Sequence, residues 1–159
     1  MKGIVVYHSF WGSSRKIAEA IAAGLNESGH DAQSVAVEGA PAPDPSLDFV
    51  VVGGATRWPG ATGKIKRYAK KMVKAGLAGR SFATFSTGGT VFDEEPNRQA
   101  SERLHEILAA GGLIPLAPPF KAGIEGYKSG GRTKGSLPQS EEARAEDFGR
   151  ELGAKLSGQ

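Results

Sequence analysis

The hydrophobic residues follow two alternating patterns along the chain. Short apolar runs at residues 3–8, 31–37, 47–54 and 81–86 have the length of strands, and a weaker run at 112–123 is interrupted by Pro115, Pro118 and Pro119. Between these runs, apolar residues recur at helical spacing, which predicts helices at 13–28, 65–73 and 100–110 and from about Ser140 onward. This alternation predicts an α/β fold with a doubly wound, five-stranded parallel sheet.

The length and composition of the chain limit the kinds of protein and of site that it can form. A chain of 159 residues is long enough for one domain, expected to span residues 1–159, and too short for two ordinary ones. The absence of cysteine excludes disulfides and thiolate metal sites, and the three scattered histidines argue against a histidine metal site. No apolar run is long enough to span a bilayer, so no membrane partner is expected. Because the first strand follows Met1 and Lys2 directly, we expect no targeting peptide and a cytoplasmic location.

Three loops leave the strands toward the same edge of the predicted sheet. They occupy residues 9–14, 53–63 and 86–97, and all three are rich in glycine, hydroxyl and aromatic residues. In a doubly wound sheet, ligands bind beyond the carboxyl ends of the strands, where the strand order reverses. We therefore expect a ligand site where these three loops meet.

The first loop has the composition of a phosphate site. Ser9, Ser13 and Ser14 lie on both sides of Gly12 and directly precede or begin a helix. The first backbone N–H groups of a helix lack intrahelical partners and carry the positive end of its dipole, so they favour a bound phosphate. A simpler interpretation is that Ser13 or Ser14 only caps the helix. The chain lacks the motifs G-x-x-x-x-G-K-[ST], G-x-G-x-x-G and G-x-S-x-G. This indicates that a phosphate would be bound without metal-dependent phosphoryl chemistry.

The stretch "YHSFWGSSRKIAEAI" resembles the signature of the flavodoxin-like superfamily, which includes FMN-binding flavodoxins and quinone reductases. The resemblance continues through "DFVVVGGATRWPG", "FATFSTGG" and the closing helix at 134–152. It implies the strand order 2-1-3-4-5 and non-covalently bound FMN. It also implies that the cofactor contacts Ser9, Phe10, Trp11, Gly12, Ser13, Ser14, Ala55, Thr56, Arg57, Trp58, Gly60, Ser86, Thr87, Gly88, Gly89 and Phe92. The serine loop would hold the phosphate, and the other two loops would frame the isoalloxazine ring, with Trp58 and Phe92 available for stacking.

No catalytic residue is predicted, because electron and hydride transfer are the chemistry of the flavin itself. Two departures from the resemblance are informative. Electron-carrier flavodoxins usually have Thr where Trp11 stands, and Asn-Thr where Ser13 and Ser14 stand. In contrast, "TRWPG" resembles the "TRFG" loop of quinone reductases of the tryptophan-repressor-binding-protein type. Three functions follow as hypotheses: an electron carrier with a redox partner protein, an NAD(P)H-dependent quinone reductase, or an interaction module that has lost its flavin.

The charge is unevenly distributed along the chain. Residues 49–92 contain no acid and eight basic residues, which predicts either a solvated helix face or a docking surface. Nucleic-acid binding is not expected, because the basic helix lacks interleaved aromatic residues. One positive charge about 8 Å from the flavin, at an effective dielectric constant near 20, is worth roughly 2 kcal/mol, or on the order of 90 mV. We therefore expect a less reducing flavin than in acidic electron carriers.

Overall fold

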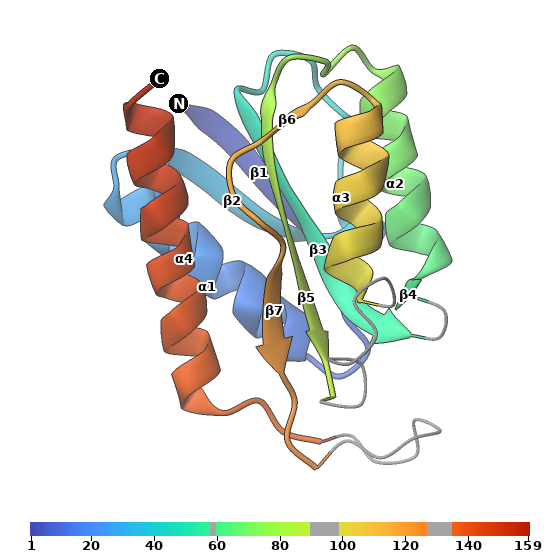
Figure 1. Cartoon of the computed structure of the whole chain (residues 1–159), viewed down its shortest axis with the longest axis vertical. Coiled ribbons are helices and arrows are strands. Elements are labelled where there is room, and N and C mark those ends of the chain that lie inside the picture. Colours follow the sequence, from blue (N-terminus) through green and yellow to red (C-terminus); the bar gives the residue numbers. More distant parts are fainter. Residues whose placement is uncertain (58–59, 90–98, 127–134) are drawn as a thin grey trace.

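The computed structural model describes residues 1–57, 60–89, 99–126 and 135–159. A central sheet is covered by α1 and α4 on one face and by α2 and α3 on the other, as Figure 1 shows. The four helices are α1 (Ser13–Glu27), α2 (Gly63–Lys74), α3 (Ala100–Ala110) and α4 (Gln139–Ser157). Each lies where the apolar periodicity predicts it. Within the described residues, none is both long and apolar enough to cross a membrane.

The sheet has the predicted doubly wound topology. Its main strands are β1 (Lys2–His8), β2 (Asp31–Ala36), β3 (Phe49–Arg57) and β5 (Ser81–Gly88). They pair in parallel in the order β2-β1-β3-β5, and the fifth predicted strand extends this order beside β5. The strand order 2-1-3-4-5 is therefore confirmed. A short 3-10 helix, η1 (Val37–Gly39), follows β2.

The fifth strand is split into two pieces that both pair with β5. β6 (Ile114–Pro115) pairs with the beginning of β5, and β7 (Phe120–Gly123) pairs with its end. Phe82 pairs with Pro115 and Phe85 with Phe120, so the fifth strand advances two residues more than β5 between these positions. Proline lacks the N–H that a ladder requires, and the two prolines in the break explain why the extra residues leave the sheet.

The third strand is longer than expected. The apolar run predicts an end at Gly54, but β3 continues to Arg57. Ala55 pairs with Thr87 of β5, and the last two residues pair in antiparallel fashion with β4 (Gly60–Ala61). The two glycines at the predicted end are explained by packing: a Cβ atom at Gly53 would lie 2.4 Å from the Phe85 ring, and one at Gly54 would lie 2.9 Å from the His8 carbonyl oxygen. These glycines are therefore part of the sheet rather than of a ligand loop.

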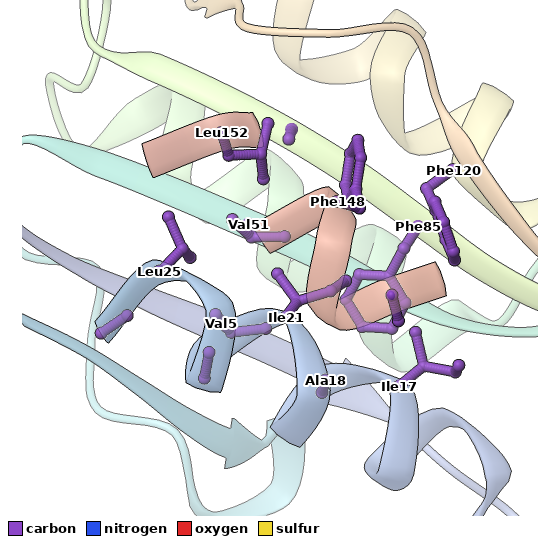
Figure 2. Packing of buried hydrophobic residues seen from close by; sticks show 14 of the residues in the cluster. Val5, Ile17, Ala18, Ile21, Leu25, Val51, Phe85, Phe120, Phe148 and Leu152 are labelled. Atoms are coloured by element: carbon purple, nitrogen blue, oxygen red, sulfur yellow. The ribbon is translucent and has the colours of Figure 1, made fainter. Parts of the chain in front are cut away.

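The hydrophobic core lies on both faces of the sheet. On one face, Ile17, Ile21 and Leu25 of α1 are fully buried against sheet residues such as Val5 and Val51 (Figure 2). On the other face, the apolar sides of α2 and α3 are buried. Complete burial of such side chains stabilises the fold by about 1.5–3 kcal/mol each. The two-sided core fixes the sheet and thereby the edge from which the predicted ligand loops leave.

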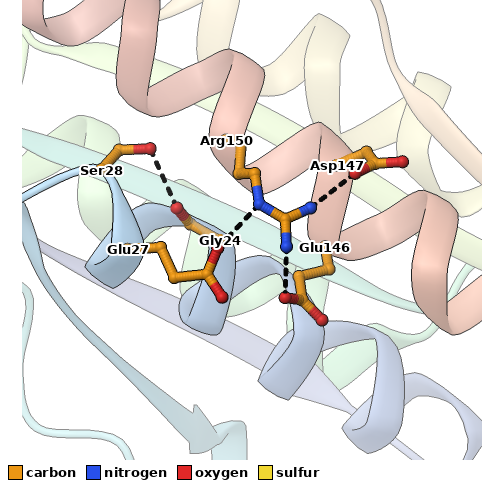
Figure 3. A network of polar contacts seen from close by, with 6 residues as sticks. All are labelled: Gly24, Glu27, Ser28, Glu146, Asp147 and Arg150. Carbon is orange, nitrogen blue, oxygen red and sulfur yellow. Dashed lines mark hydrogen bonds and ion pairs between the residues drawn. The ribbon is translucent and has the colours of Figure 1, made fainter.

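Helices α1 and α4 approach each other closely through glycines. A Cβ atom at Gly149 would lie 2.3 Å from the Ile21 carbonyl oxygen, and one at Gly24 would lie 2.2 Å from the Glu146 carbonyl oxygen. At the solvent side of this contact, Arg150 binds Glu27 of α1 and two acids of its own helix, as Figure 3 shows. Exposed ion pairs contribute about 0–1 kcal/mol each, so the backbone contact is the stronger constraint.

Candidate functional site

A pocket opens at the carboxyl ends of β1, β3 and β5. It is a small hollow with a cavity volume of about 40 Å³, and it is open to solvent. Its lining comes from the first loop and the start of α1, from the ends of β3 and β5, and from the residue after β7: Ser9, Phe10, Trp11, Ser13, Ser14, Ala55, Thr56, Arg57, Thr87, Gly88 and Ile124. Segments far apart in sequence thus meet at the edge where the topology places a ligand.

The start of α1 is shaped by a glycine turn. Gly12 has a φ of 94°, which L side chains rarely adopt, and its N–H donates a 2.9 Å hydrogen bond to Ser9 Oγ. Gly12 is the N-cap residue, and α1 has no side-chain cap. Ser14 Oγ instead shares a buried 2.9 Å hydrogen bond with Thr87 Oγ1 at the end of β5. The interpretation that Ser13 or Ser14 merely caps the helix is therefore wrong.

Two exposed aromatic rings and an arginine form the rim of the pocket. The Arg57 guanidinium carbon lies 4.1 Å from the centre of the Phe10 ring and 5.1 Å from that of Trp11. Phe10 is 44% exposed and Trp11 is 40% exposed. Cation–π contacts at exposed sites are worth about 0.5–1 kcal/mol each. Arg57 thus connects the first loop to the end of β3 and places a positive charge at the mouth of the pocket.

Behind the pocket lies a buried network of polar side chains. Gln99, which precedes α3, accepts a 2.8 Å hydrogen bond from Thr56 Oγ1 and a 3.2 Å hydrogen bond from Ser86 Oγ. Thr56 Oγ1 in turn accepts from the Ala100 N–H at 3.2 Å, and Ser86 shares a 2.9 Å hydrogen bond with Ser101. The network joins β3 and β5 to the start of α3. It gives Thr56 and Ser86 a structural role whatever the pocket binds.

The structure brings most of the predicted site residues together. Four of the described residues that were predicted for the site do not line the pocket: Gly12 in its turn, Gly60 in β4, Ser86 in the buried network and Gly89 after β5. Trp58 and Phe92 lie outside the described residues. The sequence interpretation missed Ile124 and Gln99, and only the position of Gln99 just before a helix hinted at a role. Contact of these residues with a flavin stays a prediction.

His8 forms a second polar cluster beside the pocket. Its Nδ1 atom shares a 2.6 Å hydrogen bond with Thr62 Oγ1, its Nε2 atom lies 3.3 Å from Glu38 Oε1, and its ring centre lies 4.8 Å from that of Phe10. Burial lowers the pKa of His8; Lys64 and Arg57 lower it further, while Glu38 opposes the shift. Near neutral pH the imidazole is therefore held in its neutral form.

We expect the stability of the protein to decrease as the pH falls from about 7.5 to about 5.5. Burial lowers the pKa of both His8 and His105, so the unfolded chain, with histidine pKa values near 6.5, takes up protons that the folded chain resists. The pKa of Glu38 is also lowered, but this shift changes the stability only below about pH 4.5, outside this pH range. Urea denaturation at the two pH values should show a lower midpoint at the acidic one. Two results would contradict the role of these histidines: an unchanged midpoint, or an equal decrease of the midpoint in the double variant His8→Gln/His105→Gln.

The chain matches a known family model and several solved structures. Residues 4–111 match the family model described as flavodoxin domain. Similar solved structures include a flavodoxin from the domain Archaea, with 17% identity, a TM-score of 0.78 and 99% of each chain covered. Flavodoxin 2 from Bacillus cereus has 19% identity, a TM-score of 0.76 and coverage of 98% of this chain and 99% of that one.

A WrbA-like flavodoxin from Agrobacterium tumefaciens is also similar, with 17% identity, a TM-score of 0.74 and coverage of 99% of this chain and 98% of that one. At such identities the likeness shows the fold alone. No curated protein matches the chain.

Proposed function

The chain belongs to the flavodoxin domain family, and on that premise we propose that it binds FMN non-covalently in the pocket at the carboxyl edge and transfers electrons. The observation that carries the proposal is the start of α1. There a helix without a side-chain cap opens into a pocket lined by Ser9, Ser13 and Ser14. The backbone N–H groups that begin a helix and nearby hydroxyl groups can donate hydrogen bonds to a phosphate, and the positive end of the helix dipole attracts its charge.

The residues of the first loop fit a phosphate. Within the part of the chain that the structure describes, no atom outside Gly12 and its two chain neighbours lies within 4 Å of the position a Cβ would take at Gly12, which leaves the outer side of the glycine open. Trp11 packs beside Arg57 at the rim, which supports a contact with the phosphate through its backbone rather than its indole. Ser14 is fixed by Thr87 and orients the first turn of the helix. The phosphate is thereby proposed to sit on preformed backbone geometry.

The remaining pocket residues would hold the ring. Bound FMN supplies one- and two-electron transfer. The end of β3 (residues 55–57) and the end of β5 (residues 87–88) provide two rigid walls, because the first is paired with β5 and β4 and the second with β3 and β7. Ile124 adds an apolar contact from the third side. These residues position the ring, limit its contact with water and set the charge around it.

Arg57 is expected to raise the reduction potential of the flavin. Its guanidinium is held at the rim by Phe10, and a positive charge favours the more negative, reduced cofactor. The variant Arg57→Gln should lower the potential by up to about 90 mV. Arg57→Lys keeps the charge and should retain most of the potential. Spectroelectrochemical titration of the three proteins measures the effect, and equal potentials for all three would contradict the role of Arg57.

A second candidate function is an NAD(P)H-dependent quinone reductase. Arg57 favours it, since a guanidinium at the mouth of the pocket suits a nucleotide phosphate. Stopped-flow mixing of the FMN-loaded protein with NADPH, followed by a quinone, separates the two functions. Rapid bleaching and reoxidation by the quinone favour the reductase, and bleaching only by a reduced protein partner favours the electron carrier.

The direct test of FMN binding is the visible absorption spectrum of the purified protein, followed by fluorescence titration of the apoprotein with FMN. Quenching of FMN fluorescence at a 1:1 ratio with a dissociation constant below about 1 μM is the expected result. A colourless protein that takes up no added FMN would overturn the proposal. It would favour the third hypothesis, an interaction module that has lost its flavin.

A further inference from the structure

The outer side of α2 carries a basic surface. We define the basic face as Lys64, Arg67, Lys70, Lys71 and Lys74, all of which are exposed. At 100° per residue these positions lie within an arc of about 120°, opposite the buried side of the helix. Residues 49–92, which include this helix, contain no acid. Among the ion pairs of the described residues, only Lys64 of this face takes part in one, at 3.5 Å from Glu38 Oε1.

The basic face adjoins the candidate site. Glu38 is shared between Lys64 and His8, and the His8 ring contacts Phe10 at the rim of the pocket. A shallow groove between α2 and η1 continues from this point along the helix, lined by Val37, Glu38, Lys64, Arg67, Tyr68 and Lys71. A macromolecule bound to the basic face would therefore lie next to the mouth of the pocket.

We propose that the basic face of α2 is the docking surface for an acidic protein that exchanges electrons at the adjoining pocket. The electron exchange rests on the proposed function, whereas the docking does not require a flavin. Uncompensated charges of one sign steer a partner of opposite charge and fix its orientation. Phe10, Trp11 and Arg57 are at least partly exposed at the rim, and all three are residue types that are enriched at protein interfaces.

Two contacts favour an acidic protein over a nucleic acid. Tyr68, the aromatic residue of α2, is buried, and its hydroxyl donates to the Pro41 carbonyl oxygen at 2.8 Å, so its ring is not available for stacking on bases. Glu38 places a carboxylate within the groove, where it would repel a continuous row of phosphates. A protein surface can place an acid opposite each lysine and avoid Glu38.

The test is a titration of the ¹⁵N-labelled full chain, with and without FMN, by a decaglutamate peptide in about 50 mM salt, followed by amide chemical shifts. A ten-nucleotide oligothymidine serves as the nucleic-acid probe. The variant Arg67→Glu/Lys71→Glu reverses two charges of the basic face. The control Lys2→Glu/Arg80→Glu makes the same change in net charge at exposed positions that begin β1 and precede β5, on the opposite edge of the sheet.

The expected result is a set of shift changes confined to α2, η1 and the rim, with peptide binding at least about tenfold weaker in the α2 variant and unchanged in the control. The pattern should be the same without FMN, so a failure to bind FMN would not hide it. No binding of the peptide, shift changes elsewhere, equal loss in the control or tighter binding of oligothymidine would each overturn the proposal. The last outcome would assign the face to nucleic acid.

Discussion

Replacing Ser13 by aspartate should weaken FMN binding by at least about a hundredfold and at the same time slightly stabilise the fold. Ser13 is the first residue of α1 and lines the pocket, and the first turn of this helix contains no acid. A carboxylate there interacts favourably with the helix dipole, by about 0.3–1 kcal/mol. The same carboxylate repels a phosphate about 4 Å away, by about 4 kcal/mol at an effective dielectric constant of 20. Fluorescence titration measures the first effect, and urea denaturation of the apoprotein measures the second.

The matched control is Ser13→Asn, because asparagine has nearly the size of aspartate and carries no charge. It should lose far less affinity than the aspartate variant and leave stability nearly unchanged. Because the two effects have opposite signs, general damage to the fold cannot imitate them. If the aspartate variant binds FMN as tightly as the parent chain, the phosphate does not sit at the start of α1.

The second large effect is expected at the contact between α1 and α4. Replacing a glycine by alanine in the exposed interior of a helix usually raises the free energy of unfolding by about 0.5–1 kcal/mol. For Gly149→Ala we expect the opposite, a loss of about 2–3 kcal/mol in the free energy of unfolding, because the new Cβ would lie 2.3 Å from the Ile21 carbonyl oxygen. Backbone atoms of two packed helices cannot move aside as a flexible side chain can. Urea denaturation measures the loss.

Gly63→Ala is the control for this prediction. Gly63 begins α2. Apart from its chain neighbours and the backbone of its own helix, the described residues place only the end of the flexible Arg67 side chain within 4 Å of its Cβ position, at 3.2 Å. The change in stability should stay within about 0.5 kcal/mol. A stabilising Gly149→Ala substitution would show that the two helices pack less closely than the structure describes.

The fold was predictable because each strand and helix is encoded in its own apolar pattern. Residues such as Ile17, Ile21 and Leu25 recur at helical spacing, and the uninterrupted apolar run of β3 marks a strand buried on both faces. Pairings that depend on turn geometry were not predictable in this way. Residues 55–57 have the composition of a loop, yet Ala55 pairs with Thr87 of β5, and Thr56 and Arg57 are paired because β4 folds back onto them.

The position of the site was predictable for a topological reason, since loops at the carboxyl edge of parallel strands converge. The contacts within it were not. Ser86 has the composition of a ligand residue, but it is fully buried and bonded to Gln99, a partner thirteen positions away that no local pattern identifies. The placement of Arg57 against Phe10 likewise depends on the exact geometry of the first loop and of the end of β3.

The break in the fifth strand also affects how the protein behaves in concentrated solution. An uninterrupted edge strand offers a row of free N–H and C=O groups to which another chain can add. Here the edge beside β5 consists of two short pieces, and Pro115, Pro118 and Pro119 remove three N–H donors from it. A strand from a neighbouring molecule would find no continuous ladder to extend. The irregularity that makes this strand the weakest in the sequence therefore protects this side of the sheet against aggregation.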